Sequence, residues 1–159
     1  MPLKIREAIL EDSQTIFDFI MELAIYEKLP NAVKTTVKEI KNSIFAQNST
    51  VKALICEEDG KAIGFAVYFY NYSTWLGKKG IYLEDLYVNE SKRGKGAGKA
   101  MIKYLAKKAI SEKCGRFEWA CLDWNTPSRE FYESLGAVAL NEWIGYRLEG
   151  DALEKFANN

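Results

Sequence analysis

The hexapeptide RGKGAG, residues 93–98, places three glycines where the sequence predicts the start of a helix. A glycine in a helix interior costs about 1 kcal/mol relative to alanine, so three of them this close together need a reason. The first N–H groups of a helix have no intrahelical partner and form the positive end of the helix dipole, so glycines there let a phosphate approach them closely. The hexapeptide therefore predicts a cradle for a pyrophosphate. The basic residues around it are Lys92, Arg93, Lys95 and Lys99.

The hexapeptide lies between a predicted strand that ends at Val88 and a predicted helix that begins near Gly98. Three runs before it are rich in β-branched and aromatic residues, which predicts strands, and the first two are joined by Asp59-Gly60, a hairpin signal. These runs are residues 51–58, 62–72 and 80–88. Beyond the hexapeptide, apolar side chains recur with a helical period between residues 101 and 109. The cradle therefore connects a strand to an amphipathic helix.

The N-terminal part of the chain predicts one strand and two helices. Residues 3–8 alternate as a short strand, and residues 11–28 place apolar side chains on one helical face. Asp12 or Ser13 is the candidate cap of that helix. The run TVKE, residues 36–39, has the spacing of a capping box and opens a second, shorter helix. The cradle thus follows the fourth predicted strand.

The C-terminal part predicts further strands around a short helix. Residues 116–122 are interpreted as a strand. The helix after it has Thr126 as N-cap, Pro127 in the first helical position and Gly136 as stop signal. We interpret residues 137–150 as a closing hairpin before a last helical turn.

The predicted elements follow the order β-α-α-β-β-β-α-β-α-β-β. This order describes an α/β or α+β protein, in which helices cover the faces of one sheet. A chain of 159 residues is long enough for one domain with its own hydrophobic core, and no linker or repeat interrupts it. We therefore expect a single domain over residues 1–159.

Composition excludes several classes of function. The chain contains no histidine, which rules out Ser-His-Asp and Cys-His hydrolases, histidine-ligated zinc and histidine bases. Its 22 basic and 22 acidic residues balance, which argues against a general binder of nucleic acid. No apolar run approaches the ~18 residues of a membrane span, so no membrane partner is expected. The three cysteines, Cys56, Cys114 and Cys121, are unclustered and odd in number, so the expected location is the cytoplasm.

Glycine spacing separates the known phosphate-binding loops. The P-loop pattern G-x-x-x-x-G-K-[ST] fails, because Ala100 follows Lys99 and no glycine lies five residues before Gly98. The dinucleotide fingerprint G-x-G-x-x-G fails as well, because the glycines stand at every second position from Gly94 to Gly98. That fingerprint also normally follows the first strand of its unit rather than the fourth. A different kind of loop is therefore indicated.

The pattern R-G-x-G-x-G resembles the loop that follows the fourth strand in the GCN5-related N-acetyltransferases (GNAT). A second stretch, NTPSREFYESLGA, is similar to a later helix signature of that family, N-x-x-[SA]-x-x-[FL]-Y-x-x-x-G. Its matching residues are Asn125, Ser128, Phe131, Tyr132 and Gly136. The resemblance implies the acyl-CoA N-acyltransferase fold, a mixed, mostly antiparallel sheet of about seven strands flanked by helices. It also implies acetyl-CoA as co-substrate and no metal ion.

Four further stretches narrow the resemblance. YLEDLYV, YSTWLGK, LAIYEKLP and LDWN resemble the spermidine/spermine acetyltransferase group, and especially its thialysine-acetylating branch, from about residue 4 to residue 150. The implied reaction moves an acetyl group from acetyl-CoA to a primary amine of a small cationic acceptor, such as thialysine or a polyamine. Relatives in this group differ in the amine they prefer, so these stretches do not fix the acceptor.

Acetyl transfer to an amine requires a base and an acid. A primary alkylamine has a pKa of about 10.4, so near neutral pH only about one molecule in a thousand is the neutral nucleophile. Without histidine, Glu84 is the best placed carboxylate to take the proton, directly or through water; the alternative for Glu84 is a salt bridge at the strand end. The resemblance makes Tyr132 the proton donor to the leaving thiolate; the alternative is that Tyr132 is an aromatic residue of the core.

The resemblance also implies where the coenzyme binds. Backbone N–H groups at the end of the fourth strand are expected to stabilise the oxyanion, and the cradle is expected to hold the pyrophosphate. The later helix signature would touch the pantetheine arm or the pyrophosphate region. The residues concerned are Leu86, Tyr87, Val88, Arg93, Gly94, Lys95, Gly96, Ala97, Gly98, Lys99, Asn125, Ser128 and Tyr132.

A cationic acceptor favours carboxylates and aromatic faces in its pocket. Four residues match positions that shape the acceptor pocket in the resembling group. They are Glu27, Trp75, Glu84 and Asp85. The alternative for Glu27 is a solvated helix end, and the alternative for Trp75 is a packing anchor in a loop.

Cys121 is the residue that would permit a covalent acetyl-enzyme. It alternates with Phe117 and Trp119 on one face of the predicted strand, and no histidine is present to activate its thiol. We therefore expect a buried, apolar cysteine.

The C-terminal third is rich in aromatic residues, beyond what one helix and a short hairpin could easily cover. They are Trp119, Trp124, Phe131, Tyr132, Trp143 and Tyr146. The resembling group is dimeric, with the chain end of each subunit helping to frame the site of its partner. A homodimer is therefore expected, since large, apolar and aromatic-rich surfaces are typical of such interfaces. The alternative is that these rings complete the core of the monomer.

Two other functions stay open on the sequence. A non-catalytic acetyl-CoA-binding module would keep the glycine cradle without needing Glu84 and Tyr132. A peptide or protein N-acetyltransferase would keep both but should have a wider, less acidic acceptor groove. The acidic residues Glu27, Glu84 and Asp85 favour a small cationic amine.

Overall fold

The chain falls into two units, Met1–Ala120 and Cys121–Asn159. The structure is a computed structural model and describes residues 2–159. None of the helices within these residues has the length and the apolar character needed to cross a membrane.

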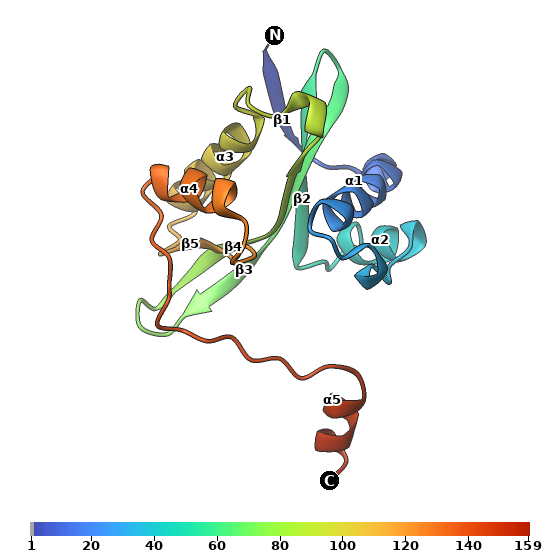
Figure 1. Ribbon diagram of the computed structural model, residues 1–159, viewed down its shortest axis with the longest axis vertical. Helices are drawn as coiled ribbons and strands as arrows, with labels where there is room; N and C mark the ends of the chain where they lie inside the picture. The colour runs from blue at the N-terminus through green and yellow to red at the C-terminus, as the bar shows by residue number, and fades with distance from the viewer. Residues whose placement is uncertain (1) are drawn as a thin grey trace. The chain divides into compact units, whose positions relative to one another are not determined.

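The first unit is built on a five-stranded sheet in the order β1-β2-β3-β4-β5 (Figure 1). The strands are β1 Leu3–Glu7, β2 Val51–Glu58, β3 Lys61–Ser73, β4 Lys78–Val88 and β5 Phe117–Trp119. Neighbours are antiparallel from β1 to β4, and β5 joins β4 in parallel. This mixed, mostly antiparallel sheet with flanking helices confirms the expected α+β fold class. The expected number of strands is wrong, because residues 2–159 form five strands and not about seven.

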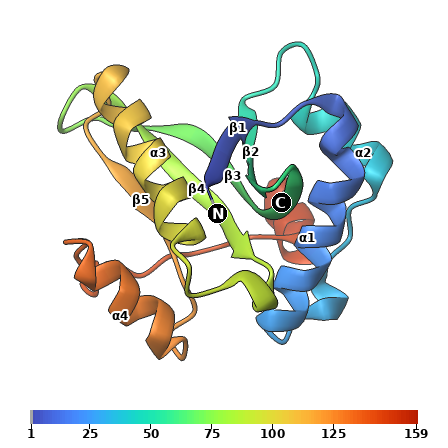
Figure 2. The same cartoon turned by 90° about the horizontal axis from the view of Figure 1, so that it is seen from above.

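Helices cover both faces of this sheet. Figure 2 shows α3 on one face and α1 and α2 on the other. The helices of the first unit are α1 Ser13–Tyr26, α2 Val37–Ile44 and α3 Ala97–Ser111, with short 3-10 turns at Leu10–Asp12, Pro30–Ala32 and Glu90–Lys92. On the α1–α2 face, the buried cluster consists of Ile16, Phe19, Ile40, Ala53, Ile55, Phe65, Val67 and Tyr87. On the other face, Met101 and Leu105 of α3 are fully buried, and side chains of this size contribute about 1.5–3 kcal/mol each.

Local signals in the sequence explain several of these elements. Asp59 and Gly60 have φ values of 52° and 77°, as a type I′ turn requires, so the predicted hairpin between β2 and β3 is confirmed. Thr36 caps α2: its hydroxyl accepts from the Glu39 amide at 3.2 Å, and the Glu39 carboxylate accepts from the Thr36 amide at 3.1 Å. At Gly64, a Cβ would lie 2.6 Å from the Tyr87 carbonyl oxygen, so only glycine lets β3 and β4 approach this closely.

The second unit contains α4, Thr126–Ser134, and α5, Gly150–Ala157. Residues 137–149 between them contain no strand, so the predicted closing hairpin is wrong. A strand needs a partner for its N–H and C=O groups, and alternation of apolar residues does not supply one. What forms instead is a turn in which the Trp143 amide donates to the Leu140 carbonyl at 3.2 Å. The predicted last helical turn is α5, which is eight residues long.

Two other boundaries differ from the prediction. The N-cap of α4 is Asn125 and not Thr126, because the Asn125 side-chain oxygen accepts from the Ser128 amide at 3.3 Å. The strand predicted over residues 116–122 ends at Trp119, so the alternation does not continue to Cys121. Cys121 is exposed, and the expectation that it is buried is wrong.

Candidate functional site

The glycine-rich loop connects β4 to α3 and forms as the glycines require. Gly94 and Gly96 have φ values of 80° and 88°, a region that residues with a side chain rarely adopt. Gly96 occupies the N-cap position of α3, and intrahelical bonding begins with the Ala100 amide donating to the Gly96 carbonyl at 2.9 Å. The amides of the first turn therefore precede the hydrogen-bonded part of the helix. A Cβ built at Gly94, Gly96 or Gly98 would meet nothing within 4 Å, so the loop borders open space.

The four basic residues of this loop fall into two pairs. Lys92 and Arg93 take part in the loop's own structure: the Lys92 ammonium lies 2.7 Å from a Glu58 carboxylate oxygen, and Arg93 Nε donates to the Val88 carbonyl at 3.0 Å. Lys95 and Lys99 have exposed side chains in the loop and in the first turn of α3. The positive charge available to an anion at the loop therefore comes chiefly from these two lysines and from the helix end.

A β-bulge on β4 sets the position of Glu84. Val67 of β3 pairs with Asp85 and Tyr68 pairs with Leu83, so Glu84 has no partner residue on β3. Glu84 is exposed, and no ion pair within the described residues involves it, which removes the strand-end salt bridge as an account of this residue. A bulge typically turns a side chain away from the regular ladder.

Asp85 lies on the face of the sheet that α1 and α2 cover. Its pairing partner Val67 belongs to the buried cluster on that face, and paired residues point to the same side. Burial, together with the negative charges of Glu84 and Glu27, raises the pKa of Asp85 to about 6. Burial also raises the pKa of Glu27, which directly follows α1. The structure thus brings together three of the four residues that the sequence assigns to the acceptor.

Trp75, the fourth, lies outside the strands of the sheet. It stands in the turn between β3 and β4, where the Gly77 amide donates to the Ser73 carbonyl at 2.8 Å. This turn is at the end of β4 opposite to Val88 and the glycine loop, and the Trp75 side chain is 82% exposed. Within the first unit, Trp75 is therefore not grouped with the three carboxylates.

One edge of β4 becomes free beside the carboxylates. Within the described residues, β5 pairs with β4 only from Ile81 to Leu83. From Asp85 to Val88 the strand is paired with β3 on its other side but not with β5. Backbone groups on this edge are thus available to a bound molecule.

The predicted site residues of the second unit lie on or next to α4. Asn125 is buried and caps the helix with its side chain, a structural role that the sequence interpretation assigned to its neighbour. Tyr132 is half-buried, with its ring 5.5 Å from that of Phe131. Roles of Asn125, Ser128 and Tyr132 toward a coenzyme remain predictions.

Sequence reasoning missed two residues on α1. The Arg93 guanidinium lies 4.7 Å from the centre of the Tyr26 ring and 5.2 Å from that of Tyr87. Glu22 accepts from the Tyr87 hydroxyl at 3.2 Å and from the Asn89 side-chain amide at 2.9 Å. About 65 residues separate these partners in sequence, so no local pattern connects them.

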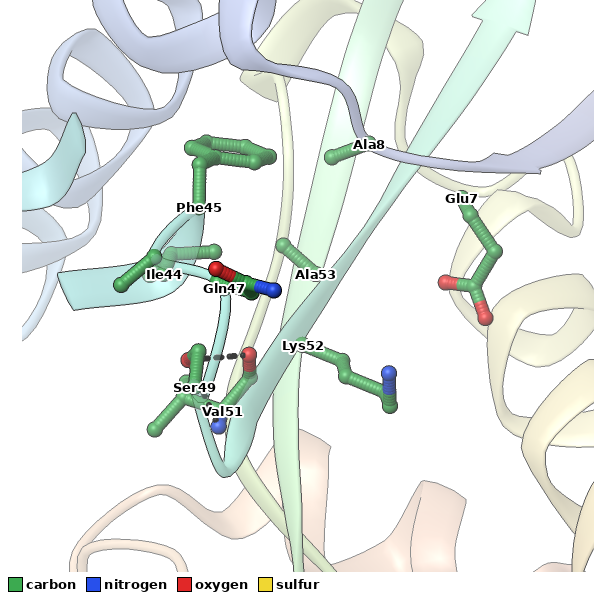
Figure 3. Close-up of a pocket in the computed structure, with 10 residues that line it drawn as sticks. Glu7, Ala8, Ile44, Phe45, Gln47, Ser49, Val51, Lys52 and Ala53 are labelled. Atoms are coloured by element: carbon green, nitrogen blue, oxygen red, sulfur yellow. Dashed lines mark hydrogen bonds between the residues drawn. The ribbon is translucent and has the colours of Figure 1, made fainter. Parts of the chain in front are cut away.

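A separate pocket of about 240 Å³ lies between the end of α2 and the start of β2. Figure 3 shows Phe45, Gln47 and Ala53 around it, with the Ser49 hydroxyl bonded to the backbone of Val51. None of the lining residues belongs to the predicted site.

Several known proteins similar to this chain are named as N-acetyltransferases. The profile of the acetyltransferase (GNAT) family matches residues 16–137. The thialysine N-epsilon-acetyltransferase of Sus scrofa is 37% identical over 96% of this chain and 96% of its own length. The Homo sapiens spermidine/spermine N(1)-acetyltransferase-like protein 1 is 34% identical over 91% of this chain and 22% of its own length. The structure of an integron cassette protein from V. cholerae is 29% identical, with a TM-score of 0.85 over 100% of this chain and 99% of that one.

Proposed function

The chain belongs to the acetyltransferase (GNAT) family, and from this premise we propose that it moves an acetyl group from acetyl-CoA to a primary amine of a small cationic acceptor, such as thialysine or a polyamine. The observation that carries the choice of acceptor is the grouping of Glu27, at the end of α1, with Glu84 and Asp85 of β4, the strand that leads into the glycine loop. The carboxylates suited to a cation and the loop suited to a phosphate are therefore connected by β4.

The glycine loop fits the pyrophosphate of acetyl-CoA. Its left-handed glycines expose the amides at the start of α3, the space beside them is open, and the side chains of Lys95 and Lys99 are exposed nearby. Amides at a helix N-terminus together with ammonium groups are the usual partners of a phosphate. The helix signature assigns Asn125 and Ser128 to the same coenzyme.

Three carboxylates suit a cationic acceptor. At neutral pH, Asp85 is mostly ionised even with a pKa of about 6, so the cluster attracts an ammonium group. The charges that repel one another in the free protein are neutralised when a cation binds between them. The binding energy of the amine is therefore expected to come largely from this cluster.

Acetyl-CoA supplies an activated acetyl group as a thioester, and the protein's own groups move the protons. Glu84 accepts a proton from the acceptor ammonium, through water, so that the amine nitrogen can attack the acetyl carbon. Backbone N–H groups on the free edge of β4, between Leu86 and Val88, stabilise negative charge on the acetyl oxygen. When the C–S bond breaks, the hydroxyl of Tyr132 gives its proton to the leaving sulfur. The second proton that the nitrogen loses as the amide forms is released to solvent, from which Tyr132 is reprotonated.

The working form is proposed to be a homodimer. Apolar side chains between residues 138 and 156 stay exposed in the single chain, among them Trp143 and Tyr146. Exposed apolar patches are typical of interaction sites. A second copy is the partner that the resembling group implies.

An acceptor panel tests the proposal. Purified protein is incubated with acetyl-CoA and one of spermidine, spermine, thialysine, lysine or a short peptide, and release of free thiol is followed. We expect turnover with small cationic amines and little with the peptide. Preference for the peptide would support a peptide acetyltransferase instead.

Two controls separate the remaining outcomes. Coenzyme binding is measured by calorimetry in the absence of any amine. Binding of acetyl-CoA without turnover of any acceptor would support a coenzyme-binding module, and no binding would contradict the assignment of the glycine loop.

A further inference from the structure

Glu22 connects helix α1 to the end of β4. One oxygen of its carboxylate accepts two hydrogen bonds, from the Tyr87 hydroxyl at 3.2 Å and from the Asn89 side-chain amide at 2.9 Å. Both donors lie at the point where β4 ends and the glycine loop begins. The Tyr87 side chain is 7% exposed, and Glu22 and Asn89 are half-buried, so these bonds are partly shielded from water.

Tyr87 in turn contacts the first residue of the loop motif. The Arg93 guanidinium lies 5.2 Å from the Tyr87 ring and 4.7 Å from the ring of Tyr26, so one aromatic ring comes from β4 and the other from α1. Its Nε donates to the Val88 carbonyl at 3.0 Å. Asn89 is held through its backbone as well, because its amide donates to the Ile63 carbonyl at 2.8 Å. Every contact of this group therefore fixes the segment from Tyr87 to Arg93.

The contacts of Arg93 change the role expected of it. Its planar guanidinium is shared between two rings, and its Nε is bonded to the backbone, as is typical of an arginine that holds a loop in place. Lys95 and Lys99, with exposed side chains, remain as the charges nearest to the cradle. Arg93 therefore holds the loop in place, whereas Lys95 and Lys99 are left to contact an anion.

We propose that Glu22 is a positioning residue of the coenzyme loop: its carboxylate fixes Tyr87 and Asn89, and through Tyr87 it holds Arg93, so that the glycines and the first turn of α3 are preorganised for a pyrophosphate. The inference rests on the proposed function, since it takes the loop to be the acetyl-CoA site. It also joins that loop to the acceptor side, because Glu27 follows the same helix five residues later. Preorganisation lowers the cost of ordering a loop on binding, so its loss raises the coenzyme concentration needed and leaves the chemical step intact.

Glu22→Ala removes the carboxylate that accepts the two hydrogen bonds. Glu22→Gln keeps a side-chain oxygen that can accept the same hydrogen bonds without the negative charge. Asp18→Ala is the matched control, because Asp18 is an exposed acidic residue on the same helix whose partner Gln14 is local. We expect Glu22→Ala to raise the KM for acetyl-CoA about tenfold with kcat within about twofold of the wild type. Glu22→Gln should recover most of the loss, and Asp18→Ala should behave as the wild type.

Hydrogen exchange of the amides of residues 89–98, measured without coenzyme, gives a readout that does not depend on the proposed function. Glu22→Ala should exchange faster there than the wild type or Asp18→Ala, while the amides of β2 stay unchanged. Unchanged loop exchange would overturn the inference, and so would a drop in kcat with an unaltered KM. Failure of the wild type itself to bind acetyl-CoA would overturn the function and leave the exchange result to decide whether Glu22 holds the loop.

Removing one donor at a time keeps the test open if Glu22→Ala does not fold. Tyr87→Phe and Asn89→Ala each delete one of the two bonds. Each variant should show part of the increase in KM and in loop exchange, and combining Glu22→Gln with Tyr87→Phe should add little to Tyr87→Phe alone. Wild-type behaviour of both single variants would contradict the inference.

Discussion

Alternating apolar side chains are buried in the first unit and exposed in the second. In the first unit, apolar side chains of β2, β3 and β4 are fully buried, as at Leu54, Phe65 and Ile81. In the second unit, Ile144, Tyr146 and Leu148 also stand at every second position, yet they are 75%, 93% and 51% exposed. An alternating pattern states which side of a strand is apolar and does not say where the partner strand is.

The difference teaches that the first unit is complete in itself and the second is not. Four antiparallel strands pair with one another in the first unit, and three helices cover the apolar faces of their sheet. Residues 137–149 have the side chains of a strand without a ladder, and α5 leaves Leu153 and Phe156 exposed. The second unit therefore leaves apolar side chains exposed, and the proposed dimer assigns them to contact with a second copy of the chain.

The largest effect is expected from Tyr132→Phe in the second unit. If Tyr132 is the proton donor that we propose, its loss should lower kcat by about 10²-fold to 10⁴-fold with little change in the affinity for acetyl-CoA. Steady-state kinetics with calorimetry measure both. Tyr72→Phe makes the same chemical change at an exposed position of β3 and should keep wild-type kcat. A Tyr132→Phe variant with the kcat of Tyr72→Phe would show that solvent or another group donates the proton.

Asp85→Asn tests how the raised pKa of Asp85 affects the stability of the protein. The pKa of Asp85 is raised from 3.8 to about 6, so the folded protein holds this proton more tightly than the unfolded chain does. As pH rises from about 4 through 6, the wild type should lose up to about 3 kcal/mol of stability to this group, and the variant should not. Urea unfolding at pH 4 and pH 7.5 measures the difference. Parallel pH profiles for variant and wild type would contradict the shift, and Asp18→Asn serves as the exposed control.

Trp143→Ala tests whether the exposed residues of the second unit form the interface. Truncating an aromatic anchor typically costs about 2 kcal/mol of association free energy. The dissociation constant of the dimer should therefore rise roughly thirtyfold. Sedimentation equilibrium at low micromolar concentration should give about twice the 18.1 kDa chain mass for the wild type and a mixture for the variant. Coenzyme affinity should be unchanged. A wild type of 18.1 kDa would refute the dimer.

The first unit could be predicted from sequence largely because its signals are local. The Asp59-Gly60 turn, the Thr36 cap and the glycine loop each need only a few neighbouring residues, and all three form as expected. The resemblance assigned Glu27, Glu84 and Asp85 to one pocket although 57 and 58 residues separate the first from the other two, and the structure groups them.

Features that depend on distant contacts could not be predicted. The bulge at Glu84 comes from a one-residue difference between the two paired strands, and the Glu22 bonds join a helix to a strand end about 65 residues away. At α4, two adjacent residues both suit an N-cap, and only the structure shows that Asn125 takes it. The closing hairpin failed for the related reason that side-chain alternation carries no information about a partner edge.

The smallest effect comes from comparing Gly77, in the turn before β4, with Gly96, in the loop that follows β4. Gly77 and Gly96 both have left-handed backbones, with φ of 63° and 88°, and a Cβ at either would meet nothing within 4 Å. Valine at either position should therefore cost similar stability, about 1–2 kcal/mol, because a β-branched residue is strained there. Only Gly96→Val also places methyl groups where a phosphate would approach the helix amides, so its affinity for acetyl-CoA should fall about tenfold, and Gly77→Val should bind as the wild type does. Calorimetry on both folded variants decides the matter, since equal affinities would mean that the loss is general strain and that the open space at Gly96 is not where the coenzyme sits.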